Sequence, residues 1–165
     1  MHLQETRQID PERPPTELRL HTKEQWDGDR PHSEQDVSSV QDILDLGVYM
    51  TTAVKCGKTT YGIKTGTIKQ CSLLLEQELA LFPRVKAFLF MGDVAIRAIN
   101  YVAQRAGEGR VIPAGSTYKI RGEEYYFRGA RAFPSYLQAG PSFFIEKSKR
   151  KMIAEDIAAA LAILP

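Results

Sequence analysis

Residues 85–102 read VKAFLFMGDVAIRAINYV, and this stretch decides the fold. Residues 85–91 form a near-continuous apolar run, which is typical of a central parallel strand covered on both faces. Gly92 and Asp93 then open a segment that ends near Gly107, and its apolar residues recur at helical spacing. These apolar residues are Val94, Ile96, Ile99 and Val102. A buried strand that leads directly into a helix predicts an α/β fold.

Further elements precede this unit. A short helix is predicted over Ser39–Gly47, with the glycine as its stop. Residues 48–54, VYMTTAV, are rich in β-branched and aromatic side chains and predict a strand. Thr67 and Gln70 have the spacing of a capping box, which predicts the start of a helix that ends before Pro83.

The C-terminal part predicts a hairpin and a long helix. Residues 118–129 alternate around an expected turn at Gly122–Glu123. The last helix is expected from about Ser142 to Leu164, and we interpret its basic residues 147–151 as a solvated helix face. In this order the elements predict a three-layer α/β/α sandwich with a small, mostly parallel central sheet.

Charge divides the chain into two parts. Residues 1–45 hold 5 Lys/Arg against 11 Asp/Glu, whereas residues 46–165 hold 17 Lys/Arg against 9 Asp/Glu. Because residues 1–38 are rich in charge and proline, we expect an acidic, largely irregular arm, followed by the folded domain over residues 39–165. The basic surplus suits a polyanionic partner such as nucleic acid, although an ordinary solvated surface explains it equally well.

Composition limits the class of protein. A hydrophobic content of 43% is sufficient for the core of one domain, and we expect a monomer. No run of 18 apolar residues is present, so no membrane partner is expected. The polar N-terminal segment lacks the apolar core of a signal peptide. Cys56 and Cys71 are too few for a disulfide framework, which favours a reducing, cytoplasmic location.

Residues 53–62, AVKCGKTTYG, raise three interpretations. Gly57–Thr59 resembles the end of a phosphate-binding loop, but that motif requires a glycine where the chain has Thr52. A metal site would need more ligands than Cys56 and Cys71. A cysteine nucleophile would need a histidine partner, and all three histidines lie in the N-terminal arm. The third interpretation is a buried strand that ends beside a pocket.

The predicted strand ends support a pocket at one edge of the sheet. They lie at residues 51–53, 91–93 and 133–135, where the side chains are mostly small or polar. Ligands of open parallel sheets bind beyond the carboxyl ends of the strands. Lys55 and Lys58 follow the first of these ends, so the pocket is expected to have a basic rim.

Four segments, in this order, give the chain a family resemblance. It resembles the uracil-DNA glycosylase superfamily, nearest the iron–sulfur bacterial and archaeal branch, as a divergent or N-terminally shortened member. The resemblance covers about residues 47–160 and implies that superfamily's α/β/α fold. The segments are VYMTTAVKC (48–56), CSLLLEQEL (71–79), VKAFLFMGDVAIRAI (85–99) and FPSYL (133–137).

The resemblance implies DNA binding, with excision of a damaged base by hydrolysis of its N-glycosidic bond. Thr52, Gly92 and Phe133 would line the base pocket. Thr52 stands where the family has an asparagine that reads the base, and Phe133 stands where it has a histidine that stabilises the leaving anion. Asp29, in Gly-Asp-Arg-Pro, is the nearest match to the acidic residue that positions water.

The resemblance also bears on the expected cofactor and DNA contacts. Cys56 and Cys71 match two of the family's four cluster cysteines, so no iron–sulfur cluster is expected unless further ligands come from outside this chain. Two alternatives stay open: a catalytically inactive nucleic-acid-binding module on the same scaffold, and a small-molecule enzyme on a similar sheet. The expected DNA contacts are Lys55, Lys58, Pro134, Ser135 and Tyr136.

Overall fold

The computed structural model describes residue 37 and residues 39–57, 62–137 and 146–164. The chain divides into two units, Met1–Tyr49 and Met50–Pro165, whereas the predicted boundary lay between residues 38 and 39.

In the first unit, helix α1 spans Val40–Asp45. The side chain of Ser39 accepts a hydrogen bond from the backbone of Asp42, whose side chain accepts one from the backbone of Ser39. Gly47 follows the helix at a φ of 73°. This short helix was correctly predicted from its cap and its glycine stop.

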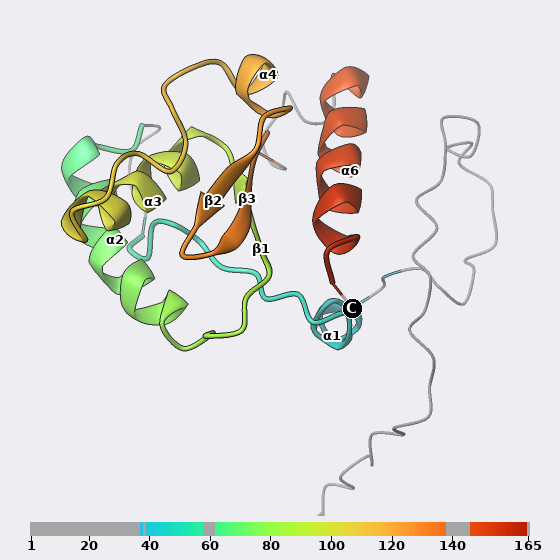
Figure 1. The fold of residues 1–165 in the computed structure, drawn as a ribbon, viewed down its shortest axis with the longest axis horizontal. Coiled ribbons are helices and arrows are strands. Elements are labelled where there is room, and N and C mark those ends of the chain that lie inside the picture. The colour runs from blue at the N-terminus through green and yellow to red at the C-terminus, as the bar shows by residue number, and fades with distance from the viewer. Residues whose placement is uncertain (1–36, 38, 58–61, 138–145, 165) are drawn as a thin grey trace, which may run out of the picture. The chain divides into compact units, whose positions relative to one another are not determined.

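The second unit combines a small sheet with helices, so the α/β class is confirmed (Figure 1). Its helices are α2 (Thr65–Leu79), α3 (Asp93–Arg105), α4 (Thr117–Ile120) and α6 (Lys147–Leu161). Its strands are β1 (Ala87–Met91), β2 (Tyr125–Phe127) and β3 (Ala130–Ser135). No helix of the described residues is long and apolar enough to cross a membrane.

The sheet has the strand order β1-β3-β2. Strand β3 is parallel to β1 and antiparallel to β2, so the described sheet is mixed rather than mostly parallel. The predicted hairpin turn at Gly122–Glu123 is wrong, because β2 and β3 are joined at Arg128–Gly129. These two residues have φ values of 49° and 79°, as the tightest hairpin turns require.

The predicted strand over residues 48–54 is also wrong, since none of these residues belongs to a described strand. β-Branched composition is a local preference, whereas a strand needs a neighbour that completes its backbone hydrogen bonds. The described strands pair only with one another. The Thr52 hydroxyl instead donates to the carbonyl of Val54, 3.0 Å away, a local bond that competes with strand pairing.

Helix α2 begins two residues earlier than the predicted capping box. Its N-cap is Lys64, which makes no side-chain cap. The hydroxyl of Thr65 instead accepts a 2.6 Å hydrogen bond from Arg97 of α3. The capping-box prediction at Thr67 is therefore wrong, because Thr67 already lies within the helix.

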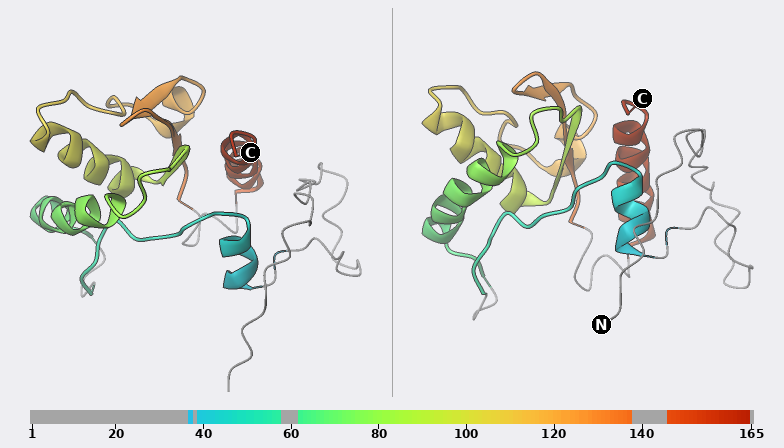
Figure 2. Two further views of the ribbon diagram at one scale, coloured as in Figure 1. Left: turned by 60° about the horizontal axis from the view of Figure 1, so that its bottom comes forward. Right: turned by 90° about the horizontal axis from the view of Figure 1, so that it is seen from below.

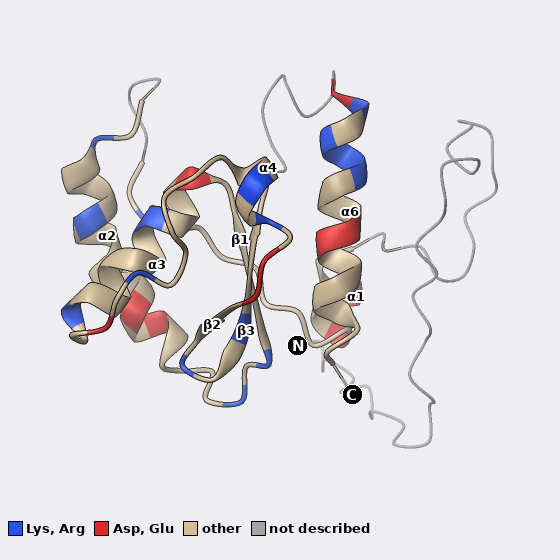
Figure 3. Ribbon diagram, turned by 45° about the horizontal axis from the view of Figure 1, so that its top comes forward, with Lys and Arg blue, Asp and Glu red and all other residues tan. Residues whose placement is uncertain are grey.

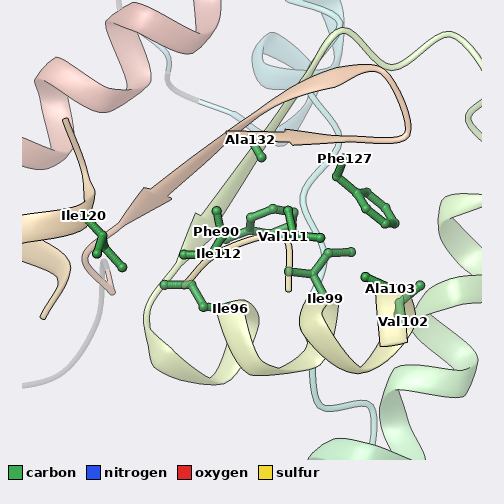
Figure 4. Close-up of a cluster of buried hydrophobic side chains, with 10 residues drawn as sticks. All are labelled: Phe90, Ile96, Ile99, Val102, Ala103, Val111, Ile112, Ile120, Phe127 and Ala132. Carbon is green, nitrogen blue, oxygen red and sulfur yellow. The ribbon is translucent and has the colours of Figure 1, made fainter. Parts of the chain in front are cut away.

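Helix α3 forms the centre of the core. Its buried residues Ile96, Ile99 and Val102 pack with Phe90 of β1 and Ala132 of β3 (Figure 4). On its other side, α3 packs against α2 through Ala98. The helical spacing seen in the sequence therefore identified a real buried face.

Helix α6 lies on the opposite side of the sheet from α2 and α3 (Figure 2). Successive side chains of a strand point to opposite faces, so Ala132 and Ser135 of β3 face different helices. Ala132 lies in the core formed with α3, and the Ser135 hydroxyl bonds to Asp156 of α6. Both faces of this small sheet are thus covered.

Candidate nucleic-acid interface

Two of the three predicted strand ends meet at one edge. Met91 and Ser135 are partners in the parallel pair of β1 and β3, and the Gly92 amide donates to the Ser135 carbonyl at 2.8 Å. Residues 51–53 are not a strand end, for the reason given above. We call the region formed by Gly92, Ser135 and Tyr136 the carboxyl edge.

At Gly92 the carboxyl edge leaves little room for a side chain. Its φ is 89°, which L side chains rarely adopt, and it is the N-cap of α3. A Cβ at this position would lie 3.1 Å from the Cβ of Leu137. The chain after β3 therefore passes directly over the glycine, where the resemblance placed part of a base pocket.

Three residues expected at a base pocket or at DNA are buried. Phe133 is 8% exposed, and the guanidinium of Arg131 lies 4.8 Å from the centre of its ring. Pro134 is among the fully buried side chains, and Ser135 is 0% exposed. In this conformation none of the three presents its side chain to a ligand in solution.

Tyr136, by contrast, links the carboxyl edge to α6. It directly follows β3 and is half-buried. The ammonium of Lys149 lies 5.7 Å from the centre of its ring, within the range of a cation–π contact. The basic first turns of α6 therefore lie beside the carboxyl end of β3. This proximity could not be predicted from the sequence, because the two segments are separated along the chain.

Of the two lysines predicted to form the basic rim of the pocket, only Lys55 is among the described residues. Lys55 forms a salt bridge with Glu78 and also donates to the hydroxyl of Thr51. The same Thr51 hydroxyl donates to Glu78 at 2.9 Å. Lys55 is thus neutralised within the unit. Lys58 and Asp29 lie outside the described residues.

The two cysteines come together from distant positions. The Sγ atoms of Cys56 and Cys71 are 3.7 Å apart; Cys56 is exposed, whereas Cys71 is buried in α2. The backbone amide of Lys55 bonds to the Cys71 sulfur and lowers the pKa of that thiol. The hydrogen bond with Cys71 raises the pKa of Cys56.

This pair does not complete a metal centre. The described residues contain no group of three or more His, Cys, Asp or Glu side chains that could hold a metal ion. An iron–sulfur cluster needs four ligands, and two thiols are present here. The expected absence of an iron–sulfur cluster stays a prediction.

Ion pairs neutralise most of the carboxylates of the second unit and leave several of its described Lys and Arg side chains unpaired. In residues 50–165, six of the nine carboxylates pair with Lys or Arg: Glu76, Glu78, Asp93, Glu146, Glu155 and Asp156. Figure 3 shows Lys and Arg of α4 and of the first turns of α6 at the same end of the unit. The exposed cations without an ion pair among the described residues are Lys64, Lys69, Arg84, Lys86, Arg110, Lys119 and Lys147.

Comparison with models of protein families, with curated proteins and with solved structures finds no match to this chain.

Proposed function

We propose that residues 50–165 bind DNA, single- or double-stranded, along the carboxyl edge and the first turns of α6. The observation that carries this proposal is the contact of Lys149 with Tyr136, which lies directly after β3. It brings basic residues 147–151 to the edge where sheets of parallel strands bind their ligands.

The charge of the unit supports a polyanion. Residues 50–165 carry 17 Lys/Arg against 9 Asp/Glu, and most of the carboxylates are already paired. Lys147 is exposed, Arg150 is half-buried, and neither has an ion-pair partner among the described residues. Cations of this kind bind phosphates and release condensed counterions, which favours association with nucleic acid.

Tyr136 adds a second type of contact. An aromatic ring flanked by cations is a common way to bind a nucleic-acid strand, because a base stacks on the ring while the cations bind phosphates. Tyr136 is half-buried, so part of its surface is open for such a contact. This combination favours DNA over a polyanion without bases.

The geometry favours binding without uracil excision. The hydroxyl of Thr52 is engaged with the Val54 carbonyl, and Phe133 is buried beneath Arg131. Excision requires groups that hold the flipped base and stabilise the leaving anion. We therefore propose a binding module on the scaffold that the resemblance implies, a three-layer arrangement of the uracil-DNA glycosylase kind. We propose that the protein acts in the cytoplasm. Excision of a base other than uracil is implied only by the family resemblance.

Binding is tested by its dependence on salt. The unmodified chain should bind a labelled oligonucleotide more weakly as salt rises, with a log–log slope of about −0.9 per phosphate contact on duplex DNA. The double variant Lys147→Ala/Arg150→Ala should reduce the magnitude of that slope by up to about 2, since it removes two cations from the first turns of α6.

The control removes the same charge elsewhere. Arg84 and Lys86 are exposed and precede β1, at the opposite end of the strand from Gly92. The variant Arg84→Ala/Lys86→Ala has the same net charge as the first variant and should leave the slope nearly unchanged. Equal losses in both variants would indicate nonspecific attraction to the whole unit and would overturn the proposed interface.

A further inference from the structure

We propose that Cys56 and Cys71 form a redox-active dithiol, which a low-molecular-weight disulfide oxidises to an intramolecular disulfide. The structure brings their sulfur atoms to 3.7 Å although 15 positions separate them in the sequence. This proposal is independent of DNA binding.

The surroundings of Cys71 hold the two residues together. Cys71 lies on the inner face of α2 and is 6% exposed, beside the buried residues Ile68 and Leu75 of the same helix. The segment that carries Cys56 passes close to this helix, since the Sγ of Cys56 lies 3.7 Å from that of Cys71. The salt bridge from Lys55 to Glu78 anchors this segment to α2.

The two sulfur atoms need only a small movement to form a disulfide. A disulfide has a sulfur–sulfur distance of about 2.05 Å, so the two atoms must approach by about 1.7 Å. Cys56 is exposed and belongs to neither a helix nor a strand, and rotation of its side chain supplies movement of this size. Cys71 can stay in its helical position.

Exposure assigns a different part to each thiol. The exposed Cys56 thiolate attacks one sulfur of the small disulfide, whose sulfur–sulfur bond breaks, and a small thiolate leaves and takes up a proton. The Cys71 thiolate then attacks the Cys56 sulfur of the mixed disulfide, and the second small thiol leaves in the same way. The two protein thiols lose two electrons and two protons, and the small disulfide is reduced to two thiols.

Oxidation would connect the segment before residue 58 to α2. The new bond would close a loop from Cys56 to Cys71 and restrict the unfolded chain. For a loop of this length the thermal midpoint of the oxidised protein should lie about 5 °C or more above that of the reduced protein.

The experiment uses the full chain in buffers of oxidised and reduced glutathione. After quenching and alkylation, mass spectrometry should show the loss of two hydrogen atoms from the intact protein. Trypsin cleaves after Lys55, Lys58, Lys69 and Arg84, so the disulfide should appear as peptide 56–58 linked to peptide 70–84. The linked fraction at a fixed buffer ratio should fall at least 10-fold in denaturant, because proximity is then lost.

Two variants separate the parts of the thiols. Cys71→Ala should stop at a stable mixed disulfide of glutathione with Cys56, whereas Cys56→Ser should take up almost none, because Cys71 is buried. The proposal is overturned if the unmodified chain yields only the mixed disulfide, or only a dimer linked through Cys56. It is equally overturned if the linked fraction is the same in denaturant.

Discussion

The Ser135 hydroxyl donates a 2.6 Å hydrogen bond to the carboxylate of Asp156 in the interior of the second unit. Ser135 is 0% exposed and Asp156 is 5% exposed. The guanidinium of Arg121, which follows α4, bonds to the same carboxylate at 2.8 Å and compensates its charge. A serine that the sequence suggested as a phosphate contact therefore joins β3 to α6, and the arginine connects both to α4.

Removal of the Ser135 hydroxyl should destabilise the fold moderately. In Ser135→Ala the carboxylate of Asp156 keeps Arg121 but loses a charge-assisted bond, so the free energy of unfolding should fall by about 1.5–3 kcal/mol. Urea denaturation measures this change. Ser148→Ala, at an exposed position of α6, is the matched control and should change stability by less than about 0.5 kcal/mol. Equal effects in the two variants would contradict a structural role for the buried bond.

Truncation of Asp156 should be more severe. Asp156→Ala leaves both the Ser135 hydroxyl and the Arg121 guanidinium without their buried acceptor, which typically costs about 3–5 kcal/mol. The same urea titration should therefore rank Asp156→Ala well below Ser135→Ala in stability. The opposite order would mean that Arg121 finds a sufficient partner in Glu155, to which it also bonds at 3.0 Å.

Gly92 should not tolerate a side chain. In Gly92→Ala the new Cβ would meet Leu137 at 3.1 Å and the backbone would keep a φ of 89°, so destabilisation by more than about 1 kcal/mol is expected. Gly122→Ala is the control, because a Cβ there meets no atom within 4 Å and its φ is not in the left-handed region. Thermal melting of the two variants measures the difference in stability. Similar midpoints would show that the chain after β3 shifts to accommodate the new methyl group at little cost.

The ion pairs of Glu76 should make stability depend on pH. Hydrogen bonds from Arg105, aided by Arg128, lower the pKa of Glu76. A carboxylate whose folded pKa is depressed contributes stability above its unfolded pKa, and this contribution is lost as the pH falls through the folded value. Glu76→Gln should therefore cost about 1 kcal/mol at pH 7 and progressively less as the pH falls below the ordinary glutamate pKa and through the lowered folded value. A cost that does not change with pH would exclude the charge as its cause.

Uracil excision should be undetectable in the unmodified protein. Loss of one donor from a preorganised site typically lowers the rate about 10²–10³-fold, and Phe133 cannot donate. Phe133→His alone should not restore activity, because position 133 lies beneath Arg131 and is 8% exposed. Incubation with a single-stranded, uracil-containing oligonucleotide, followed by cleavage at abasic sites, measures this. Excision at ordinary enzymatic rates would locate the chemistry in groups outside the described residues, with Asp29 the first to replace.

Local sequence determined the central unit of the fold. The apolar run over 85–91 became β1, and the helical spacing after Gly92 became α3, which ends at Arg105 just before Gly107. Both predictions are confirmed because apolar periodicity and a glycine stop act within a few residues of one another. For the same reason the capped helix after Ser39 was predicted correctly.

The tertiary structure alone decided which elements and side chains become partners. Residues 48–54 have the composition of a strand but pair with no strand of the described residues, and the hairpin turns at Arg128–Gly129 rather than at the earlier glycine. Lys55 pairs with Glu78, and Cys56 contacts Cys71, because α2 lies against the segment that carries Lys55 and Cys56. Composition and spacing describe the preferences of each segment by itself. Burial and charge pairing depend on which distant segments pack together, and for this chain that packing determined which of the candidate site residues remain accessible.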